Sequence, residues 1–202
     1  MVQKKDILMK TVIIQYNAGN IRSVDFALRR LGIFAETTSD HGKIRSADKV
    51  IFPGVGEASS TMRYLRKAGL DKVIEKLSQP VLGICLGMQL MCHSSEENDA
   101  ACLGILESRV RKFRSNKLKI PHVGWSRIYN LQSSLFDGVE EESYVYFVHS
   151  FYVEEETHTI AKADYSKPFS AAIQKENFFA TQFHPEKSGK TGEQILKNFI
   201  RL

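Results

Sequence analysis

The stretch PVLGICLGMQL, residues 80–90, places one cysteine between two glycines where one hydrophobic pattern gives way to another. Residues 80–85 form a short apolar run opened by a proline, which favours a buried β-strand, and residues 88–93 have the spacing of a helix. Cys85 would then lie on a turn from strand to helix, where the backbone is strained and neighbouring segments come close. Glycine at positions 83 and 87 relieves that crowding, so the pattern is typical of a nucleophile elbow.

An elbow of this kind would give Cys85 two chemical advantages. The amino terminus of a helix carries a partial positive charge, which favours a thiolate over a thiol. The backbone N–H of Leu86 would lie in the first helical turn, where amides have no partner within the helix, so we expect it to be free to donate a hydrogen bond. Cys92 and Cys102 have no flanking glycines, and we interpret them as small buried core residues.

The segments on the amino-terminal side of the elbow alternate between strand-like and helix-like patterns. Short apolar or β-branched runs indicate strands, and apolar residues three and four positions apart indicate helices. Strands are expected at 11–16, 33–38 and 47–52, and helices at 21–32, 61–70 and 70–77. This alternation predicts an α/β fold: a doubly wound, mostly parallel central sheet with a flavodoxin-like core and helices on both faces.

The carboxyl-terminal half has a different character, because its strand-like segments follow one another with no long helix between them. These segments are 105–113, 143–153, 158–165, 169–175 and 178–184, and a closing helix is expected at 192–200. Successive strands without crossover helices predict an added antiparallel strand region. The chain contains no repeat, low-complexity linker or composition boundary, so we expect residues 1–202 to form a single domain.

The composition is that of an ordinary globular protein, with 43% hydrophobic and 25% charged residues among 202. The three cysteines form no C-x-x-C pair, and the chain has no apolar leader and no run of about 18 apolar residues. We therefore expect a reducing, cytoplasmic location and no membrane segment. Zinc-type Cys/His spacing, a P-loop and a dinucleotide fingerprint are all absent from the sequence, which predicts no metal and no organic cofactor.

A net charge of +5 raises the question of nucleic acid binding. The densest basic stretch is RVRKFRSNKLK, residues 109–119, in which only Phe113 is aromatic. No RNA-binding or helix-turn-helix signature accompanies it. We therefore predict a solvated hairpin face and no nucleic acid partner, with docking on an acidic or phosphate-bearing partner as the lesser alternative.

A cysteine nucleophile needs a base within hydrogen-bonding reach and a third group that orients the base. The segment FFATQFHPEKSG, residues 178–189, supplies both. His184 and Glu186 follow an apolar strand at positions i and i+2, which would place them on one side of it, while Pro185 stiffens the exit. Among the six histidines, only His184 precedes an acidic residue in this way. The sequence therefore predicts a triad of Cys85, His184 and Glu186.

With these residues in place, the sequence resembles the class I glutamine amidotransferases. The segments that carry the resemblance are YNAGNIRSVDFALRRLG (16–32), PGVGE (53–57), GICLGMQL (83–90), PHVGW (121–125), YFVHSFY (146–152) and HPEKSGKTG (184–192). They occur in order over nearly the whole chain. The resemblance implies an enzyme that hydrolyses L-glutamine to glutamate and ammonia through a thioester on Cys85, with His184 moving the proton and Glu186 orienting His184.

The resemblance also implies where glutamine is held. Leu86 and Val55 would supply the two backbone donors of the oxyanion hole. Gly54 and Gly56 would flank the substrate and let that loop pivot. The other residues expected to bind glutamine are Gln89, Glu97, His149, Ser150 and Phe151. In this interpretation Glu97 meets the substrate ammonium, and residues 149–151 contact the amino-acid end through their backbone.

The likeness is closer still to one group in this family, the glutaminase subunits that pair with a (β/α)8-barrel cyclase in histidine biosynthesis. It implies a heterodimer in which ammonia reaches the cyclase through a channel, and weak activity of the isolated subunit. The segment 121–125, with His122 and Trp125, is expected toward the partner. The chain departs from the usual residues of this group at Gln15, Asn17, Ala18 and Ser126, which lie near the expected docking face.

These departures leave other functions open. A paralogous glutaminase would feed ammonia to a similar barrel partner for amidination in a bacterial surface-sugar pathway. A class I-like cysteine hydrolase or peptidase would use a similar elbow, but it gives no reason for the matches at Gln89 and HPEKS. A non-catalytic binding module is disfavoured because Cys85, His184 and Glu186 are all present.

Overall fold

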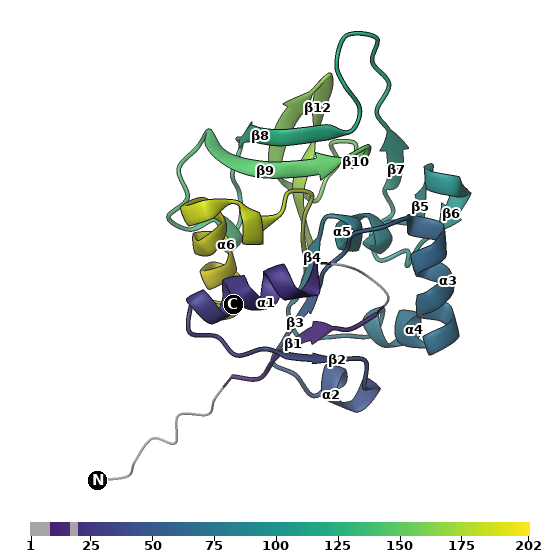
Figure 1. The fold of residues 1–202 in the computed structure, drawn as a ribbon, viewed down its shortest axis with the longest axis vertical. Coiled ribbons are helices and arrows are strands. Elements are labelled where there is room, and N and C mark those ends of the chain that lie inside the picture. Colours follow the sequence, from purple (N-terminus) through teal and green to yellow (C-terminus); the bar gives the residue numbers. More distant parts are fainter. Residues whose placement is uncertain (1–8, 17–19) are drawn as a thin grey trace.

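The computed structural model describes residues 9–16 and 20–202, so the departures noted at Asn17 and Ala18 lie outside the described residues (Figure 1). Within this part of the chain, a central sheet of seven strands has the order β11-β12-β13-β4-β3-β1-β2. The strands of this sheet are β1 (Thr11–Ile14), β2 (Glu36–Thr38), β3 (Lys49–Phe52), β4 (Val81–Ile84), β11 (Thr159–Tyr165), β12 (Lys167–Lys175) and β13 (Phe178–Thr181).

Parallel pairing dominates this sheet. Strands β2, β1, β3, β4 and β13 pair with their neighbours in parallel, whereas β11, β12 and β13 pair antiparallel. Strand β13 therefore belongs to both parts, parallel to β4 on one side and antiparallel to β12 on the other. The predicted α/β fold, a mostly parallel sheet with an added antiparallel region, is confirmed.

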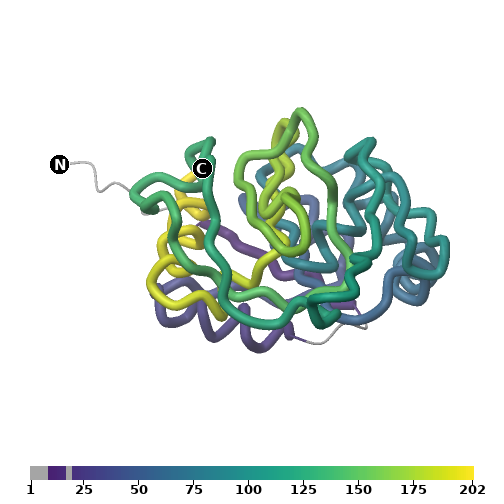
Figure 2. The backbone as a smooth tube through the Cα atoms, turned by 90° about the horizontal axis from the view of Figure 1, so that it is seen from above, coloured from purple at the N-terminus to yellow at the C-terminus, as the bar shows by residue number. Residues whose placement is uncertain are grey.

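Alternation along the central strands divides the hydrophobic core into two layers. On β1, Val12 and Ile14 pack on one face of the sheet and Ile13 packs on the other. The first face is covered by α2 (His41–Arg45), α3 (Ala58–Ala68), α4 (Leu70–Ile74) and α5 (Leu86–Met91), and the second by α1 (Ile21–Arg30) and α6 (Gly189–Arg201). Figure 2 shows α1 and α6, in purple and yellow, on the side opposite to α3 and α4, in blue. The predicted cover of both faces is therefore present.

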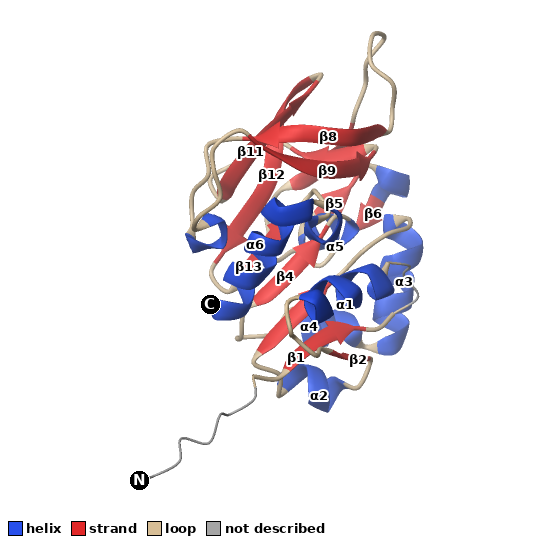
Figure 3. Ribbon diagram, turned by 60° about the vertical axis from the view of Figure 1, so that its left-hand side comes forward, coloured by secondary structure: helices blue, strands red, loops and turns tan. Residues whose placement is uncertain are grey.

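Two smaller sheets complete the described structure (Figure 3). One is the antiparallel pair of β8 (His122–Ile128) and β9 (Ser143–His149), and the other has the order β10-β7-β5-β6. The strands of this second sheet are β5 (Ser94–Ser95), β6 (Ala100–Ala101), β7 (Arg109–Lys112) and β10 (Phe151–Val153). Both sheets supply walls of the site described below.

These smaller sheets contain the main departures from the predicted elements. Residues 143–153, expected as one strand, divide at Ser150 into β9 and β10, which belong to different sheets, and β8 was not predicted. The basic stretch forms no hairpin with its own continuation, because β7 pairs with β10 and β5. A short alternating segment does not encode which distant strand it will pair with, so these pairings were inaccessible to local patterns.

Element ends differ in smaller ways. Helix α3 begins three residues before its predicted start, because the Glu57 carboxylate caps it by accepting from the amides of Ser59 and Ser60. The short helix α2 was not predicted, and the strand expected at 33–38 is confined to Glu36–Thr38. Over residues 9–16 and 20–202, no helix is long and apolar enough to cross a membrane.

Candidate active site

The candidate site lies where three neighbouring parallel strands end. Strand β4 pairs with β3 on one side and β13 on the other, with Gly83 opposite Phe52 and Ile84 opposite Thr181. The carboxyl ends of parallel strands meet at one edge of a sheet. The segments that follow these strands therefore converge there: the loop 53–56, Cys85, and the segment that carries His184.

Cys85 occupies the predicted elbow between β4 and α5. Its backbone has φ 54° and ψ −107°, a conformation that is strained for a residue with a side chain. A Cβ atom at Gly87 would lie 2.1 Å from the carbonyl oxygen of Phe52, and one at Gly83 would lie 2.9 Å from Cε of Met91. Gly87 is thus required by close approach of a neighbouring backbone segment, whereas Gly83 lies against the end of the flexible Met91 side chain.

His184 and Glu186 meet in the interior of the protein. Nδ1 of His184 lies 2.7 Å from Oε1 of Glu186. The route to this contact differs from the prediction: β13 ends at Thr181, and Glu186 lies on a 3-10 turn, Pro185–Lys187, rather than on the strand. Pro185 opens this turn because its fixed φ suits the first position of a helix.

A third polar side chain joins this pair. The Nδ2 amide of Asn20, the residue that precedes α1, donates to Oε1 of Glu186 and lies 3.4 Å from Nδ1 of His184. Asn20 was not among the predicted site residues. Its position before a helix indicated only a cap, and no local pattern connects it with a carboxylate more than 160 residues later.

The environment of His184 favours a protonated ring. Burial opposes the charge on the ring, but the neighbouring Cys85 and Glu186 outweigh it and raise the pKa of His184 to about 10. Nε2 of His184 has no hydrogen-bond partner in the described structure, and the Cys85 thiol instead contacts the carbonyl of Val148 at 3.9 Å. The buried Nε2 is therefore left to exchange a proton.

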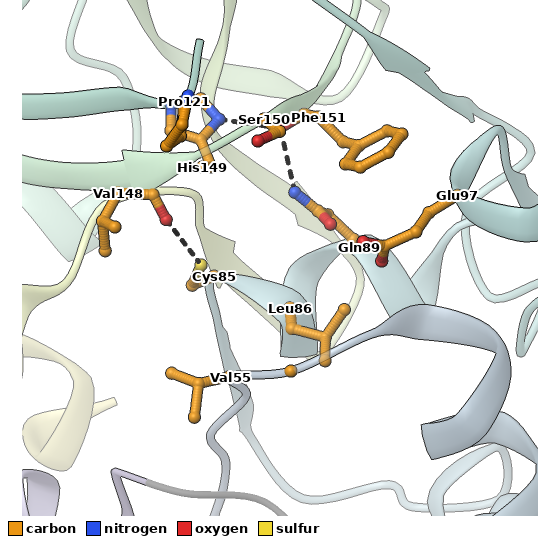
Figure 4. Close-up of a pocket in the computed structure, with 11 residues that line it drawn as sticks. Val55, Cys85, Leu86, Gln89, Glu97, Pro121, Val148, His149, Ser150 and Phe151 are labelled. Atoms are coloured by element: carbon orange, nitrogen blue, oxygen red, sulfur yellow. Dashed lines mark hydrogen bonds between the residues drawn. The ribbon is translucent and has the colours of Figure 1, made fainter.

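A pocket of about 310 Å³ opens beside Cys85 (Figure 4). The predicted residues Val55, Gly56, Cys85, Leu86, Gln89, Glu97, His149, Ser150 and Phe151 line it, together with Pro121 and Val148, which the sequence did not indicate. Gly54 does not line it but packs against the elbow, where a Cβ would lie 2.4 Å from the Gly87 amide nitrogen. His184 and Glu186 are buried outside the lining.

Gln89 and Glu97 reach the pocket from different elements. Gln89 lies one helical turn after Cys85, and its Nε2 donates to the carbonyl of Phe151 at 3.0 Å. Glu97 is half-buried and accepts from the amide of Ala58 at 2.8 Å. Burial raises the pKa of the Glu97 carboxyl, and the bond from Ala58 opposes this shift. The pocket thus combines an amide and an acidic group beside a thiol.

One hydrogen bond of the loop after β3 differs from the prediction. The Leu86 N–H, expected to be free, donates to the carbonyl of Gly54 at 3.4 Å. The start of this loop is held by the hydroxyl of Tyr16, which donates to the carbonyl of Pro53. The first amides of a helix lack partners within the helix itself. A carbonyl from another segment, here the loop after β3, can still accept from them.

His149 lines the pocket and also belongs to a buried group of hydrogen-bonded side chains. Its Nδ1 lies 2.7 Å from the Phe151 carbonyl and its Nε2 lies 3.1 Å from Nδ1 of His122. Nε2 of His122 in turn lies 2.9 Å from the hydroxyl of Ser126. Burial lowers the pKa of His122 to about 4 and that of His149 to about 3, so both rings are neutral at physiological pH.

Comparison with known proteins places this geometry in a family. The model of the family described as glutamine amidotransferase class-I matches residues 12–202. The chain therefore belongs to the class I glutamine amidotransferases. Two solved structures from Thermotoga maritima share the fold: PurLQS, with a TM-score of 0.72 at 17% identity over 95% of this chain and 97% of that one, and a glutamine amidotransferase, with 0.64 at 15% identity over 94% and 81%.

Curated relatives narrow the family further. The imidazole glycerol phosphate synthase subunit HisH of Bacteroides fragilis (strain YCH46) is 58% identical over 196 residues, 96% of this chain and 100% of its own length. The subunit HisH of Pasteurella multocida (strain Pm70) is 46% identical over 194 residues, 96% of this chain and 98% of its own length. Within the class I family, this chain groups with the HisH glutaminase subunits.

Proposed function

We propose that this chain hydrolyses L-glutamine to glutamate and ammonia at Cys85 and passes the ammonia to a (β/α)8-barrel cyclase in histidine biosynthesis. The observation that carries the proposal is the convergence of the Cys85 elbow, the His184–Glu186 pair and a pocket of about 310 Å³ at the ends of three adjacent strands. Nucleophile, base, orienting group and substrate space are the parts that a thiol-dependent acyl transfer needs.

The proton path follows from the tautomer of His184. Glu186 accepts from Nδ1, and because the raised pKa of His184 keeps the ring protonated, Nε2 already carries the proton that the reaction moves when sulfur attacks the side-chain amide carbon of glutamine. The same proton then passes to the departing ammonia, which leaves a glutamyl thioester on Cys85. Water cleaves the thioester with His184 as base, and Glu186 keeps the ring oriented.

The oxyanion requires two backbone donors, for which we propose Leu86 and Val55. The Gly54 carbonyl and the Val55 N–H belong to the same peptide unit. Because that carbonyl occupies the Leu86 N–H, rotation of this one peptide would both release Leu86 and turn the Val55 N–H toward the same space. Each donor is worth about 3 kcal/mol of barrier, so a resting state with the hole closed would give weak basal activity.

The pocket residues suit the two ends of glutamine. We propose that Glu97 meets the substrate ammonium, and that the backbone at Ser150 and Phe151 contacts the carboxylate end. Gly56 lines the pocket beside the reacting amide and has a φ of 127°, which only glycine adopts without strain, whereas Gly54 supports the elbow behind it. Gln89 lies between these groups and Cys85 along the pocket wall.

The outer face of the β8–β9 pair supports a protein partner. Val123, Trp125 and Tyr144 are exposed there, and Trp125 leaves 54% of its surface accessible. Trp125 packs edge-on against Tyr146 on the paired strand. Exposed aromatic residues on a flat strand pair are typical of protein interfaces. We propose that the cyclase docks on this face, which begins at the pocket residues Pro121 and Val148.

We also propose a cytoplasmic location and a single domain for residues 1–202. Delivery of ammonia to a surface-sugar pathway is less favoured, because the relatives named above, at 58% and 46% identity, are HisH subunits.

A glutaminase assay with and without the cyclase subunit from the same genome tests the proposal. Hydrolysis of glutamine that rises several-fold or more with the cyclase and its nucleotide ligand is the expected result. Hydrolysis that rises only with a sugar-amidating partner would move the chain to the alternative pathway. Cleavage of peptides or esters without glutamine hydrolysis would identify a different cysteine hydrolase.

A further inference from the structure

A buried chain of hydrogen bonds connects the carbonyl of Phe151 with the thiol of Cys85. Nε2 of Gln89 donates one hydrogen to that carbonyl and lies 3.0 Å from Oε1 of Gln182, to which it donates the other. Nε2 of Gln182 lies 3.7 Å from Sγ of Cys85. Gln182 is completely buried and Gln89 is nearly so. Gln182 has no assigned role in the reaction described above.

The direction of this chain is fixed at its backbone end. A carbonyl oxygen only accepts, so the Gln89 amide must turn its NH2 group toward Phe151 (Figure 4). The second hydrogen of that group then requires an acceptor, which is the carbonyl oxygen of Gln182. The Gln182 amide therefore cannot rotate by 180°, and its NH2 group has to face the sulfur of Cys85.

Two histidines on the other side of Phe151 also donate toward its carbonyl oxygen, directly or through one another. Nδ1 of His149 must donate to the Phe151 carbonyl, so its Nε2 accepts from Nδ1 of His122. Nε2 of His122 then accepts from the hydroxyl of Ser126. Both rings stay neutral because burial keeps their pKa values low, at about 4 for His122 and about 3 for His149. The carbonyl of Phe151 thus receives donors from both sides and keeps its place.

We propose that Gln182 is a positioning residue for the nucleophile: its amide NH2 group donates to the sulfur of Cys85 and stabilises the thiolate form in the line of attack. The donor is neutral, so it stabilises the thiolate without competing for the proton that His184 must carry. The proposal rests on the proposed function, since it takes Cys85 as the attacking group. It also explains why a fully buried glutamine directly precedes the His184 segment.

The same polarity gives Gln89 a different role. Both of its amide hydrogens are engaged, so only Oε1 remains to meet a ligand in the pocket. An acceptor at this position favours the N–H groups of glutamine. We therefore expect Gln89 to act on substrate binding directly and on thiol reactivity only through the orientation of Gln182, whereas Gln182 acts on thiol reactivity directly.

The test compares the rate at which iodoacetamide alkylates Cys85 in several variants of the full chain, all carrying Cys102→Ser so that the other partly exposed thiol is absent. Gln182→Met removes the donor with little change in volume, and Gln182→Glu keeps the acceptor toward Gln89 but replaces the donor. Both should slow alkylation about tenfold or more at neutral pH, and kcat for glutamine should fall in parallel. Gln89→Met should raise KM and also slow alkylation, but less than Gln182→Met does, because the Gln182 amide loses the partner that fixes its orientation and keeps its own NH2 group.

Alkylation of Gln182→Met at the rate of the parent chain would overturn the proposal, even if Gln182→Glu were slow, since the introduced charge alone would then be responsible. Alkylation needs neither glutamine nor a partner, so the two proposals fail separately. Absence of glutaminase activity in the presence of the cyclase would refute the proposed function, and the alkylation rates would still decide the role of Gln182.

A second measurement leaves Gln182 in place in case its variants do not fold. The side-chain amide protons of Gln182 should shift in the NMR spectrum of Cys85→Ala. Those of Gln79, which donate to the distant carbonyl of Ile44, should not. Unchanged Gln182 resonances would overturn the proposal.

Discussion

Nδ1 of His184 lies 2.7 Å from Oε1 of Glu186, and neither side chain is accessible to solvent. Burial lowers the pKa of the ring, but Cys85 and Glu186 together raise it to about 10. We therefore expect Glu186→Gln to lower the pKa of His184 and to reduce kcat at least about 100-fold, because the amide no longer fixes the reactive tautomer. Nitrogen NMR of labelled histidine measures the titration directly. An unchanged His184 titration in this variant would contradict the assignment of Glu186.

The same pair predicts how stability depends on pH. The pKa of His184 is raised from about 6.5 in the unfolded chain to about 10 in the folded protein, so the folded state binds the proton more tightly. The resulting stabilisation is fully present below about pH 6.5 and is lost as the pH rises toward 10. Urea unfolding between pH 6 and 10 should therefore show a steeper loss of stability in the parent than in Glu186→Gln. Equal slopes would indicate that this contact does not hold the proton.

Cys85→Ser should lower the rate of glutamine hydrolysis about 1000-fold or more, because a serine hydroxyl is a far weaker nucleophile without a stronger base. Cys102→Ser is the matched control, since Cys102 lies outside the pocket and should retain the parental rate. The assay measures glutamate release in the presence of the cyclase. Substantial hydrolysis by Cys85→Ser would remove the thiol from the mechanism.

Gly87→Ala should destabilise the fold, because its new Cβ would lie 2.1 Å from the carbonyl oxygen of Phe52, a backbone atom that cannot move aside as a side chain could. Overpacking of this kind costs about 1–3 kcal/mol or more. Gly42→Ala in α2 provides the comparison, since its Cβ would meet only a side-chain oxygen of Asp40 at 3.2 Å. We expect that variant to lie within about 1 kcal/mol of the parent in the free energy of unfolding. Similar losses in both variants would show that crowding at the elbow is not decisive.

Trp125→Ala should weaken binding of the cyclase about tenfold or more, since exposed aromatic residues at the centre of an interface contribute most of its affinity. Phe34→Ala is a suitable control, because Phe34 is 72% exposed and comes two residues before β2. Strand β2 lies at the end of the molecule away from β8 and β9 (Figure 1). Isothermal titration of each variant with the cyclase gives both affinities. A loss with Phe34→Ala alone would place the interface elsewhere.

The elbow and the His184–Glu186 contact were predictable because their constraints are local or nearly so. Two glycines around Cys85 indicate a crowded turn. An acidic residue two positions after His184 remains within reach of the ring whether the segment is a strand or, as here, a 3-10 turn. The alternation of strands and helices likewise predicted the parallel core. These features depend on periodicity and short spacing, which a sequence displays directly.

The parts that escaped prediction depend on contacts between distant segments. Gln182 follows a strand and Asn20 precedes a helix, and only the folded chain brings them to Cys85 and Glu186. The Leu86 amide was expected to be free because a rule about helix ends does not include the Gly54 carbonyl. The pairing of β8 with β9 also depends on partners that neither segment specifies alone.

The adjacency of β4 and β13 has a consequence for the newly made protein. Cys85 lies in the first half of the chain, whereas His184 follows β13, the strand that ends at Thr181. A ribosome that has released only the first 175 residues has therefore produced a thiol with no imidazole beside it. We therefore expect no glutamine hydrolysis by the chain before translation has passed His184.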